Sequence, residues 1–137
     1  MITIEFEGEI VAKGRPRVTK RGTFTPKKTR DFEKYVRLVT KTNVKEPILG
    51  GVAVDIMVMK MPPISWSKKK RLDAIVGEII PTTRPDVDNY AKSILDGMSG
   101  VAFEDDSSIL DLRVKKKYAE KDGAVVMVKK IDGETPY

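Results

Sequence analysis

The sequence contains no cysteine and no histidine. Without cysteine, the chain can form no disulfide, use no thiol nucleophile and bind no zinc through thiolates. Without histidine, it lacks the most common general base and the most common transition-metal ligand. Any catalysis by this chain would therefore use carboxylates, lysines, hydroxyl groups or a metal ion bound through oxygen, such as Mg²⁺.

Long hydrophobic runs are also missing. No segment approaches the roughly 18 apolar residues of a membrane span, and the first residues carry acids where a signal peptide would carry lysines. We therefore expect a cytoplasmic protein with no membrane partner. The 137 residues, 40% hydrophobic and 34% charged, suit one domain over residues 1–137. A chain of this size buries about two thirds of its unfolded surface and needs no covalent cross-link to form a core.

Basic residues exceed acidic ones by 26 to 20, and their distribution is uneven. The segment 12–30 holds eight basic residues and no acid: Lys13, Arg15, Arg17, Lys20, Arg21, Lys27, Lys28 and Arg30. The acids concentrate between Asp86 and Asp111. A basic flank beside an acidic cluster suits a polyanionic substrate brought to a cation site. On composition alone, a modest positive charge that keeps the protein soluble is an equally good explanation.

Alternation of apolar and polar residues predicts the strands. One strand is expected over residues 2–12, and a central strand over 50–61, which only Asp55 interrupts. Residues 108–120 and 124–131 are expected to pair as a hairpin joined through 121–123. The segment 13–26 is punctuated by glycine and proline and predicts a basic loop with a short hairpin at 20–22.

Apolar residues at helical spacing predict three helices. The first covers about residues 28–43. The second is short, with Ser67 as its N-cap, and reaches about Val76. The third covers about residues 88–99. The order of the elements favours an α+β architecture with the helices packed on one face of the sheet.

The stretch "RPDVDNYAKSILDGM" (84–98) combines acids, an asparagine and a lysine at the start of the third predicted helix. Pro85 keeps the preceding residue extended. If residues 86–88 are extended too, Asp86 and Asp88 point to one side and Val87 turns toward the core. Lys92 follows Asp88 by one helical turn, and Asp96 continues that stripe. Taken alone, the stretch is better explained by a helix cap with an i,i+4 acid–lysine pair.

A second acidic stretch, "FEDDSS", follows the helix and contains Glu104, Asp105 and Asp106. The helix is about long enough for the chain to cross the domain and return these acids toward the first ones, although a polar turn would look the same. Carboxylates that meet at one point repel each other unless a cation neutralises them. Mg²⁺ accepts one or two protein carboxylates together with phosphate oxygens, and it can activate water for attack at phosphorus. These residues beside a basic loop indicate a phosphodiesterase, with the lysine stabilising the developing charge.

Together, "RPDVDNYAKSILDGM" and "FEDDSSI" resemble the RusA family of Holliday-junction resolvases, small endonucleases common in prophages. The segments "GRPRVTKRGTFTP" and "SWSKKKR" resemble the prophage branch of that family. The resemblance spans about residues 12–120. It implies a small single α+β domain with a mixed β-sheet, acting as a homodimer. The implied activity is Mg²⁺-dependent cleavage of four-way DNA by paired nicks, in recombination and repair.

Carried over by position, the resemblance assigns roles to individual residues. The catalytic residues are Asp86, Asp88, Lys92 and Asp106, and the three aspartates are the Mg²⁺ ligands. Asp105 is the alternative third ligand, since the two aspartates are adjacent. Asn89 matches the motif asparagine and supports the site. Where some members have arginine directly before the first acid, this chain has Pro85, with Arg84 one position earlier.

The DNA contacts expected on this basis come from Arg15, Arg17, Lys20, Arg21, Arg84 and Asn89, with the Lys68–Arg71 run as an outer contact. Phe24 either stacks on an unpaired base or anchors its loop. Two other functions fit the same residues. One is a non-catalytic nucleic-acid-binding module that uses its acids as caps and turns, and the other is a metal-dependent phosphoesterase acting on nucleotides.

Overall fold

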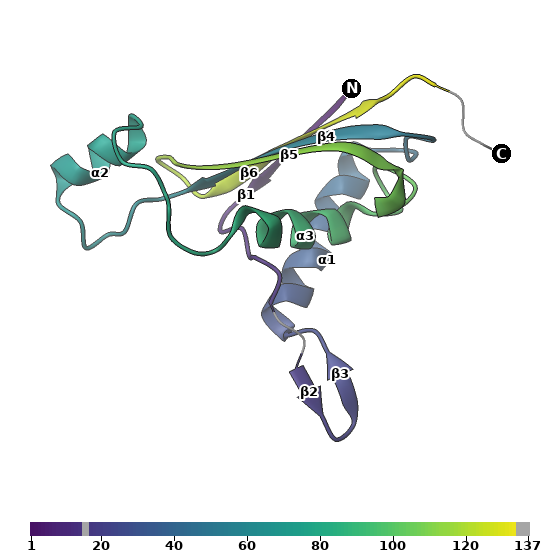
Figure 1. The fold of residues 1–137 in the computed structure, drawn as a ribbon, viewed down its shortest axis with the longest axis horizontal. Coiled ribbons are helices and arrows are strands. Elements are labelled where there is room, and N and C mark those ends of the chain that lie inside the picture. The colour runs from purple at the N-terminus through teal and green to yellow at the C-terminus, as the bar shows by residue number, and fades with distance from the viewer. Residues whose placement is uncertain (15–16, 134–137) are drawn as a thin grey trace.

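A computed structural model describes residues 1–14 and 17–133 (Figure 1). One four-stranded sheet has the order β1-β6-β4-β5. The strands are β1 (Ile2–Glu7), β4 (Val52–Lys60), β5 (Ile109–Tyr118) and β6 (Gly123–Lys130). β6 pairs antiparallel with β1 and β4, whereas β4 and β5 are parallel. The predicted α+β fold with a mixed sheet is confirmed.

Two helices cover one face of this sheet. Figure 1 shows α1 (Lys27–Asn43) and α3 (Val87–Met98) below it. The apolar residues of β4 that face them, Val52, Val54, Ile56 and Val58, are all buried. β4 lies between β6 and β5, so its predicted central position is also confirmed.

The two helices approach each other closely at Gly97 of α3. A Cβ atom at this position would lie 2.7 Å from Cβ of Val36 on α1 and 3.0 Å from the carbonyl oxygen of Glu33. Ile94 and Met98 are fully buried beside this contact. The contact fixes the rotation of α3, so that its polar stripe with Asp88 and Lys92 faces outward.

The expected hairpin of the last two strands is wrong. β4 lies between β5 and β6, so that Asp55 pairs with Arg113 on one side and Met127 on the other. The connection crosses the end of β4, where Ala119 N–H donates to the Lys60 carbonyl at 3.0 Å. A strand that is apolar on both faces favours a neighbour along each edge, whereas the lysine-rich β5 suits the sheet edge.

The first strand is shorter than expected because it ends at Glu7, before Gly8 at φ 90°. The residues that follow run along α3 instead. Ser93 Oγ donates to the Val11 carbonyl at 2.6 Å, and the Lys13 N–H donates to the Asn89 carbonyl at 2.9 Å. The segment leading to the basic loop is therefore tied to the helix that carries the acidic motif.

The predicted short hairpin is confirmed. β2 (Arg17–Thr19) pairs antiparallel with β3 (Gly22–Phe24) across a turn formed by Lys20 and Arg21. This hairpin projects away from the sheet near the start of α1 (Figure 1).

The second predicted helix is also present as α2 (Lys68–Ile75), and the Ser67 side chain caps it by accepting from the Lys70 N–H at 3.2 Å. α2 lies beside the sheet rather than over it (Figure 1). Within residues 1–14 and 17–133, no helix has the length and apolar character needed to cross a membrane.

Candidate functional site

Two unpaired carboxylates stand at the start of α3. Asp86 occupies the N-cap position with extended backbone angles, but its side chain makes no capping hydrogen bond. Asp88 lies in the first turn and is exposed. Within the described residues, neither side chain has an ion pair or a hydrogen bond to another side chain. Neither carboxylate is therefore engaged in a side-chain cap or in an i,i+4 pair with Lys92.

The expectation of an extended 86–88 segment is wrong, because the helix begins at Val87. Only Asp86 has extended angles, as an N-cap residue does. The period-two argument therefore fails, and Val87 is exposed rather than turned into the core. Asp88, Lys92 and Asp96 instead share one face of α3 through their i,i+4 spacing.

Lys92 pairs with Asp96 rather than with Asp88. Its Nζ lies 3.4 Å from Asp96 Oδ1, while Asp96 Oδ2 lies 3.0 Å from Lys13 Nζ. Lys13 also contacts Glu33 Oε1 at 2.6 Å and so links α1 to α3. Burial lowers the pKa of Lys13, but its hydrogen bonds to Glu33 and Asp96 outweigh that effect and raise the pKa above its usual value.

Asp106 lies near Asp96 and Lys92 of α3. It starts the short 3₁₀ turn Asp106–Ser108, which leads into β5. Burial raises the pKa of Asp106 above its usual value, with the nearby Asp96 adding to the rise and Lys92 opposing it. The expected return of the acidic turn thus brings Asp106 toward Lys92 and Asp96.

Asp105 has a different role from its neighbour. Its carboxylate accepts from the hydroxyl of Ser107 at 2.8 Å and from the Ser107 N–H at 3.3 Å. These hydrogen bonds hold the pKa of Asp105 below its usual value. Asp105 thus stabilises the turn, while Asp106 is the aspartate that faces α3.

The three predicted metal ligands are not all brought together. Among residues 1–14 and 17–133, no interaction joins Asp86 or Asp88 to Asp106. No group of three or more acidic side chains in that part of the chain is arranged to hold a metal ion. Mg²⁺ in proteins often takes one or two carboxylates and keeps several waters. The free oxygens of Asp86 and Asp88 suit a cation of that kind.

The expected DNA-contacting residues lie in two regions. Arg84 and Asn89 are exposed beside the start of α3, and Lys20 and Arg21 are exposed at the turn of the β2–β3 hairpin. Arg15 lies outside the described residues, as do the side chains of Arg17 and Phe24.

The Lys68–Arg71 run at the start of α2 is partly engaged within the protein. Lys70 Nζ lies 4.0 Å above the ring of Trp66, and Arg71 is partly buried. Lys68 and Lys69 are exposed and remain available for an outer contact.

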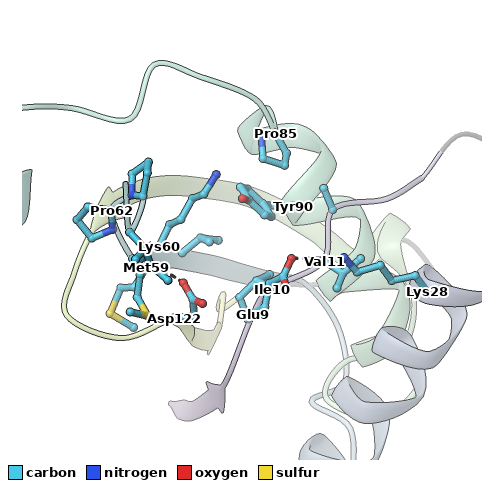
Figure 2. Close-up of a pocket in the computed structure, with 15 residues that line it drawn as sticks. Glu9, Ile10, Val11, Lys28, Met59, Lys60, Pro62, Pro85, Tyr90 and Asp122 are labelled. Carbon is cyan, nitrogen blue, oxygen red and sulfur yellow. Dashed lines mark hydrogen bonds and ion pairs between the residues drawn. The ribbon is translucent and has the colours of Figure 1, made fainter. Parts of the chain in front are cut away.

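A groove of about 510 Å³ runs beside the start of α3. Figure 2 shows the Tyr90 ring between Pro85 and Lys60, with Glu9 facing it. Burial raises the pKa of the Tyr90 hydroxyl above its usual value, and Glu9 and Asp122 add to the rise. Because Pro85 directly precedes Asp86, a molecule in this groove would lie close to the first acid of the motif.

Comparisons with known proteins cover nearly the whole chain. A family model described as "Endodeoxyribonuclease RusA" matches residues 7–129, which include the acidic motif, Lys92 and Asp106. The chain is also 40% identical over 131 residues to "Uncharacterized protein YqaN" of Bacillus subtilis (strain 168). That alignment covers 90% of this chain and 92% of the Bacillus protein.

Proposed function

Because the chain belongs to the RusA family of endodeoxyribonucleases, we propose that it resolves Holliday junctions by paired, Mg²⁺-dependent nicks in four-way DNA. In this proposal the protein resolves recombination and repair intermediates in the cytoplasm of a bacterial host, where it serves either the host or a prophage. The observation that carries the proposal is the pair of unpartnered carboxylates, Asp86 and Asp88, in a chain without histidine, with Lys92 one helical turn after Asp88.

Asp86 and Asp88 are the proposed principal ligands of Mg²⁺, and Asp106 is the proposed third acid. When bound, Mg²⁺ supplies an activated water and stabilises charge on the scissile phosphate. Burial raises the pKa of Asp106, and the nearby negative charge of Asp96 adds to the rise. A cation bound beside Asp106 would relieve that repulsion, which supports Asp106 as the third acid.

Lys92 is the proposed phosphate-binding group. Its ammonium is exposed and makes one long contact with Asp96, at 3.4 Å. Asp96 in turn is anchored by Lys13 at 3.0 Å. Lys92 can therefore exchange a weak ion pair for a phosphate oxygen without breaking the α1–α3 link, and its charge would stabilise the developing oxyanion.

We propose that the basic β2–β3 hairpin binds the phosphates of the DNA backbone. Its turn residues Lys20 and Arg21 project from the body with the hairpin (Figure 1). Phosphate contacts of this kind fix the register of the protein on DNA without reading sequence. We expect junction binding to weaken steeply with salt, which favours long DNA over a free nucleotide as the substrate.

A homodimer is proposed because paired incisions need two active sites related by symmetry. An apolar surface on α2 and the residues after it is the proposed contact with the second copy of the chain. Leu72, Val76 and Ile80 are 53%, 71% and 67% exposed, and we call them the α2 surface. Val76 and Ile80 line a groove of about 690 Å³ between the segment that follows α2 and β5. Clustered exposed apolar residues mark interaction sites more often than isolated ones do.

The test of this function is cleavage of a labelled four-way junction and a matching linear duplex, with and without Mg²⁺. Asp88→Asn should reduce junction cleavage by on the order of 100-fold or more, while junction binding measured with Ca²⁺ in place of Mg²⁺ persists. Asp111→Asn is the matched control, since Asp111 is also exposed and lies on β5.

Each alternative gives a different result in the same assay. Normal cleavage by Asp88→Asn would show that the assigned metal site is wrong. Binding without any nicking by the wild-type protein would favour the non-catalytic module. Equal cleavage of the junction and the duplex would show that the protein is a general nuclease and not a resolvase.

A further inference from the structure

The loop that carries the chain from α2 to the acidic motif has few bonds of its own to the sheet. The backbone N–H groups of Gly77, Glu78 and Thr82 donate to carbonyls that are at most five residues away. Within the described part of the chain, none of the backbone hydrogen bonds of residues 79–86 reaches a strand. The position of this loop, and of the helix start that follows it, must be set by other contacts.

Lys116 of β5 supplies those contacts. Its Nζ donates to the carbonyl oxygen of Thr83 at 2.7 Å and to that of Pro85 at 2.9 Å. In residues 1–14 and 17–133, these are the hydrogen bonds that join the segment 79–86 to the sheet. One ammonium group therefore clamps the chain at two carbonyls just before Asp86.

The strand geometry explains why Lys116, and not a neighbouring lysine, has this role. Lys116 pairs with the buried Val58 in the parallel β4–β5 ladder, so its side chain lies on the helix-covered face. Lys115 and Lys117 point to the opposite face, because side chains alternate along a strand, and both are exposed.

The chemistry of the contact is also selective. Within the described residues, Lys116 forms no ion pair with a carboxylate. Its donors are therefore directed at backbone carbonyls, and a charged donor makes a stronger hydrogen bond than a neutral one.

The clamp acts on Asp86 through the planarity of the peptide group. The carbonyl of Pro85 lies in one plane with the nitrogen and Cα of Asp86. A hydrogen bond that holds this oxygen therefore also holds the nitrogen and Cα of Asp86, and with them the start of α3. Since the Asp86 side chain makes no capping hydrogen bond, it adds no anchor of its own at this point.

We propose that Lys116 is a positioning residue for the reaction: it fixes the start of α3 so that Asp86 and Asp88 are held together for catalysis. This inference rests on the proposed function, because it assumes that these two aspartates carry the cleavage. Lys116 acts through the backbone and does not itself touch DNA.

The first test compares Lys116→Met with Lys117→Met in single-turnover cleavage of a four-way junction. Both changes remove one positive charge from β5, but only the first removes the clamp. A displacement of about 1 Å at a reacting group costs on the order of 100-fold in rate. We expect Lys116→Met to cleave roughly 10- to 100-fold more slowly at saturating junction, and to need more Mg²⁺ for half-maximal cleavage. Lys117→Met should retain the wild-type rate and Mg²⁺ requirement.

Junction-binding measurements and an arginine variant separate a positioning role of Lys116 from an effect of its charge, and thermal melting separates it from an effect on folding. Junction affinity in Ca²⁺ should be the same for both methionine variants, and Lys116→Arg, which keeps the charge and several donors, should recover most of the rate. Thermal melting checks the fold, and Lys116→Gln replaces Lys116→Met if the methionine variant melts below the assay temperature. Equal losses in Lys116→Met (or Lys116→Gln) and Lys117→Met, or no recovery with arginine, would overturn the proposal.

Amide hydrogen exchange tests the clamp without relying on activity. Peptides that cover residues 79–90 should exchange faster in Lys116→Met than in wild type or Lys117→Met, with other peptides unchanged. Unaltered exchange of residues 79–90 in Lys116→Met would overturn the inference, independently of the result of the cleavage assays. Faster exchange in Lys116→Met, combined with a wild-type protein that cuts no junction, would instead show that the clamp exists and that the proposed function is wrong.

Discussion

At the scale of single residues, Lys13 joins segments that are far apart in the chain. Its ammonium contacts Glu33 on α1 and Asp96 on α3, and its N–H donates to the Asn89 carbonyl. The two carboxylates are both partly buried, so they can lie near one another only with a cation between them. Lys13 thereby couples the packing of the two helices to the position of Asp96 beside Lys92.

Replacement of Lys13 by methionine should measure this coupling. We expect Lys13→Met to lower the free energy of unfolding by about 1–3 kcal/mol, because it leaves two facing carboxylates without their partner. Lys27→Met is the matched control. Lys27 contacts Asp31 at the same 2.6 Å, but both side chains are exposed to water, so loss of this ion pair should lower the free energy of unfolding much less than Lys13→Met does. Urea denaturation of both variants checks the prediction, and equal losses would contradict it.

The raised pKa of Lys13 determines how the stability difference between wild type and Lys13→Met depends on pH. A lysine whose pKa is higher in the folded state stabilises the fold below its unfolded pKa, near 10.5, and loses this effect as the pH rises through the folded pKa. The gap in stability between wild type and Lys13→Met should therefore stay constant between about pH 6 and 9. A gap that closes within that range would show that another group is responsible.

The sequence predicts part of the candidate site and not the rest. Local spacing is enough to place Asp88, Lys92 and Asp96 on one helix face, but the expected return of Asp106 toward Asp86 and Asp88 instead brings it near Asp96 and Lys92. Local spacing does not reveal Lys13 or Lys116, because nothing in the spacing of lysines says which of them meets a residue more than 30 positions away. The extended interpretation of Asp86–Asp88 failed because an N-cap residue is extended while the next residue is already helical.

At the scale of elements, the α1–α3 contact depends on a glycine in the middle of a helix. Glycine normally weakens a helix by about 0.5–1 kcal/mol relative to alanine. At position 97, however, an added Cβ would lie 2.7 Å from both Cβ and Cγ1 of Val36. Because Val36 is fully buried, it cannot move aside freely.

Gly97→Ala should therefore destabilise the protein, against the usual sign for such a change in a helix. We expect a loss of about 1–3 kcal/mol, as for other overpacked cores. Val36→Ala in the same chain removes Cγ1, one of the two Val36 atoms that lie 2.7 Å from the added Cβ. The double variant should therefore be more stable than the sum of the two single losses predicts. Urea denaturation of the four proteins gives the coupling, and additive losses would show that the helices are not in steric contact at this point.

Strand pairing is the feature of the fold that local pattern could not settle. β5 and β6 are adjacent in sequence and carry a turn between them, which favours a hairpin, yet β4 separates them. The side chain of Asp122 in that turn accepts from the Met61 N–H at 2.8 Å, beyond the end of β4. This contact joins residues 61 positions apart, and no pattern within a short window contains it.

At the scale of the whole molecule, charge and apolar surface lie on different parts of the chain. The basic hairpin turn projects from the body near the start of α1, whereas the α2 surface lies beside the sheet (Figure 1). A partner that covers Leu72, Val76 and Ile80 would therefore leave the hairpin free to bind DNA. This separation is what a dimer needs if each copy is to bring its own basic hairpin and its own acidic motif to one four-way junction.

The double variant Leu72→Asp/Val76→Asp tests this arrangement. Two charges in the α2 surface should be compatible with the monomer fold, since both side chains are already exposed, but they should prevent a second copy from covering that surface. In light scattering after size exclusion, we expect wild type at twice 15.3 kDa and the variant at 15.3 kDa. Leu38→Asp is the control, because Leu38 is 66% exposed on the distant helix α1, and it should remain dimeric.

The same variant separates assembly from chemistry. With a junction in a supercoiled circle, a dimer cuts both strands before it dissociates and gives a linear product. The monomeric variant keeps Asp86, Asp88 and Lys92, so it should still nick, but mainly one strand at a time, and nicked circles should accumulate. Paired cutting by a monomeric variant, or a dimer that survives both charges, would show that the α2 surface is not where two copies meet.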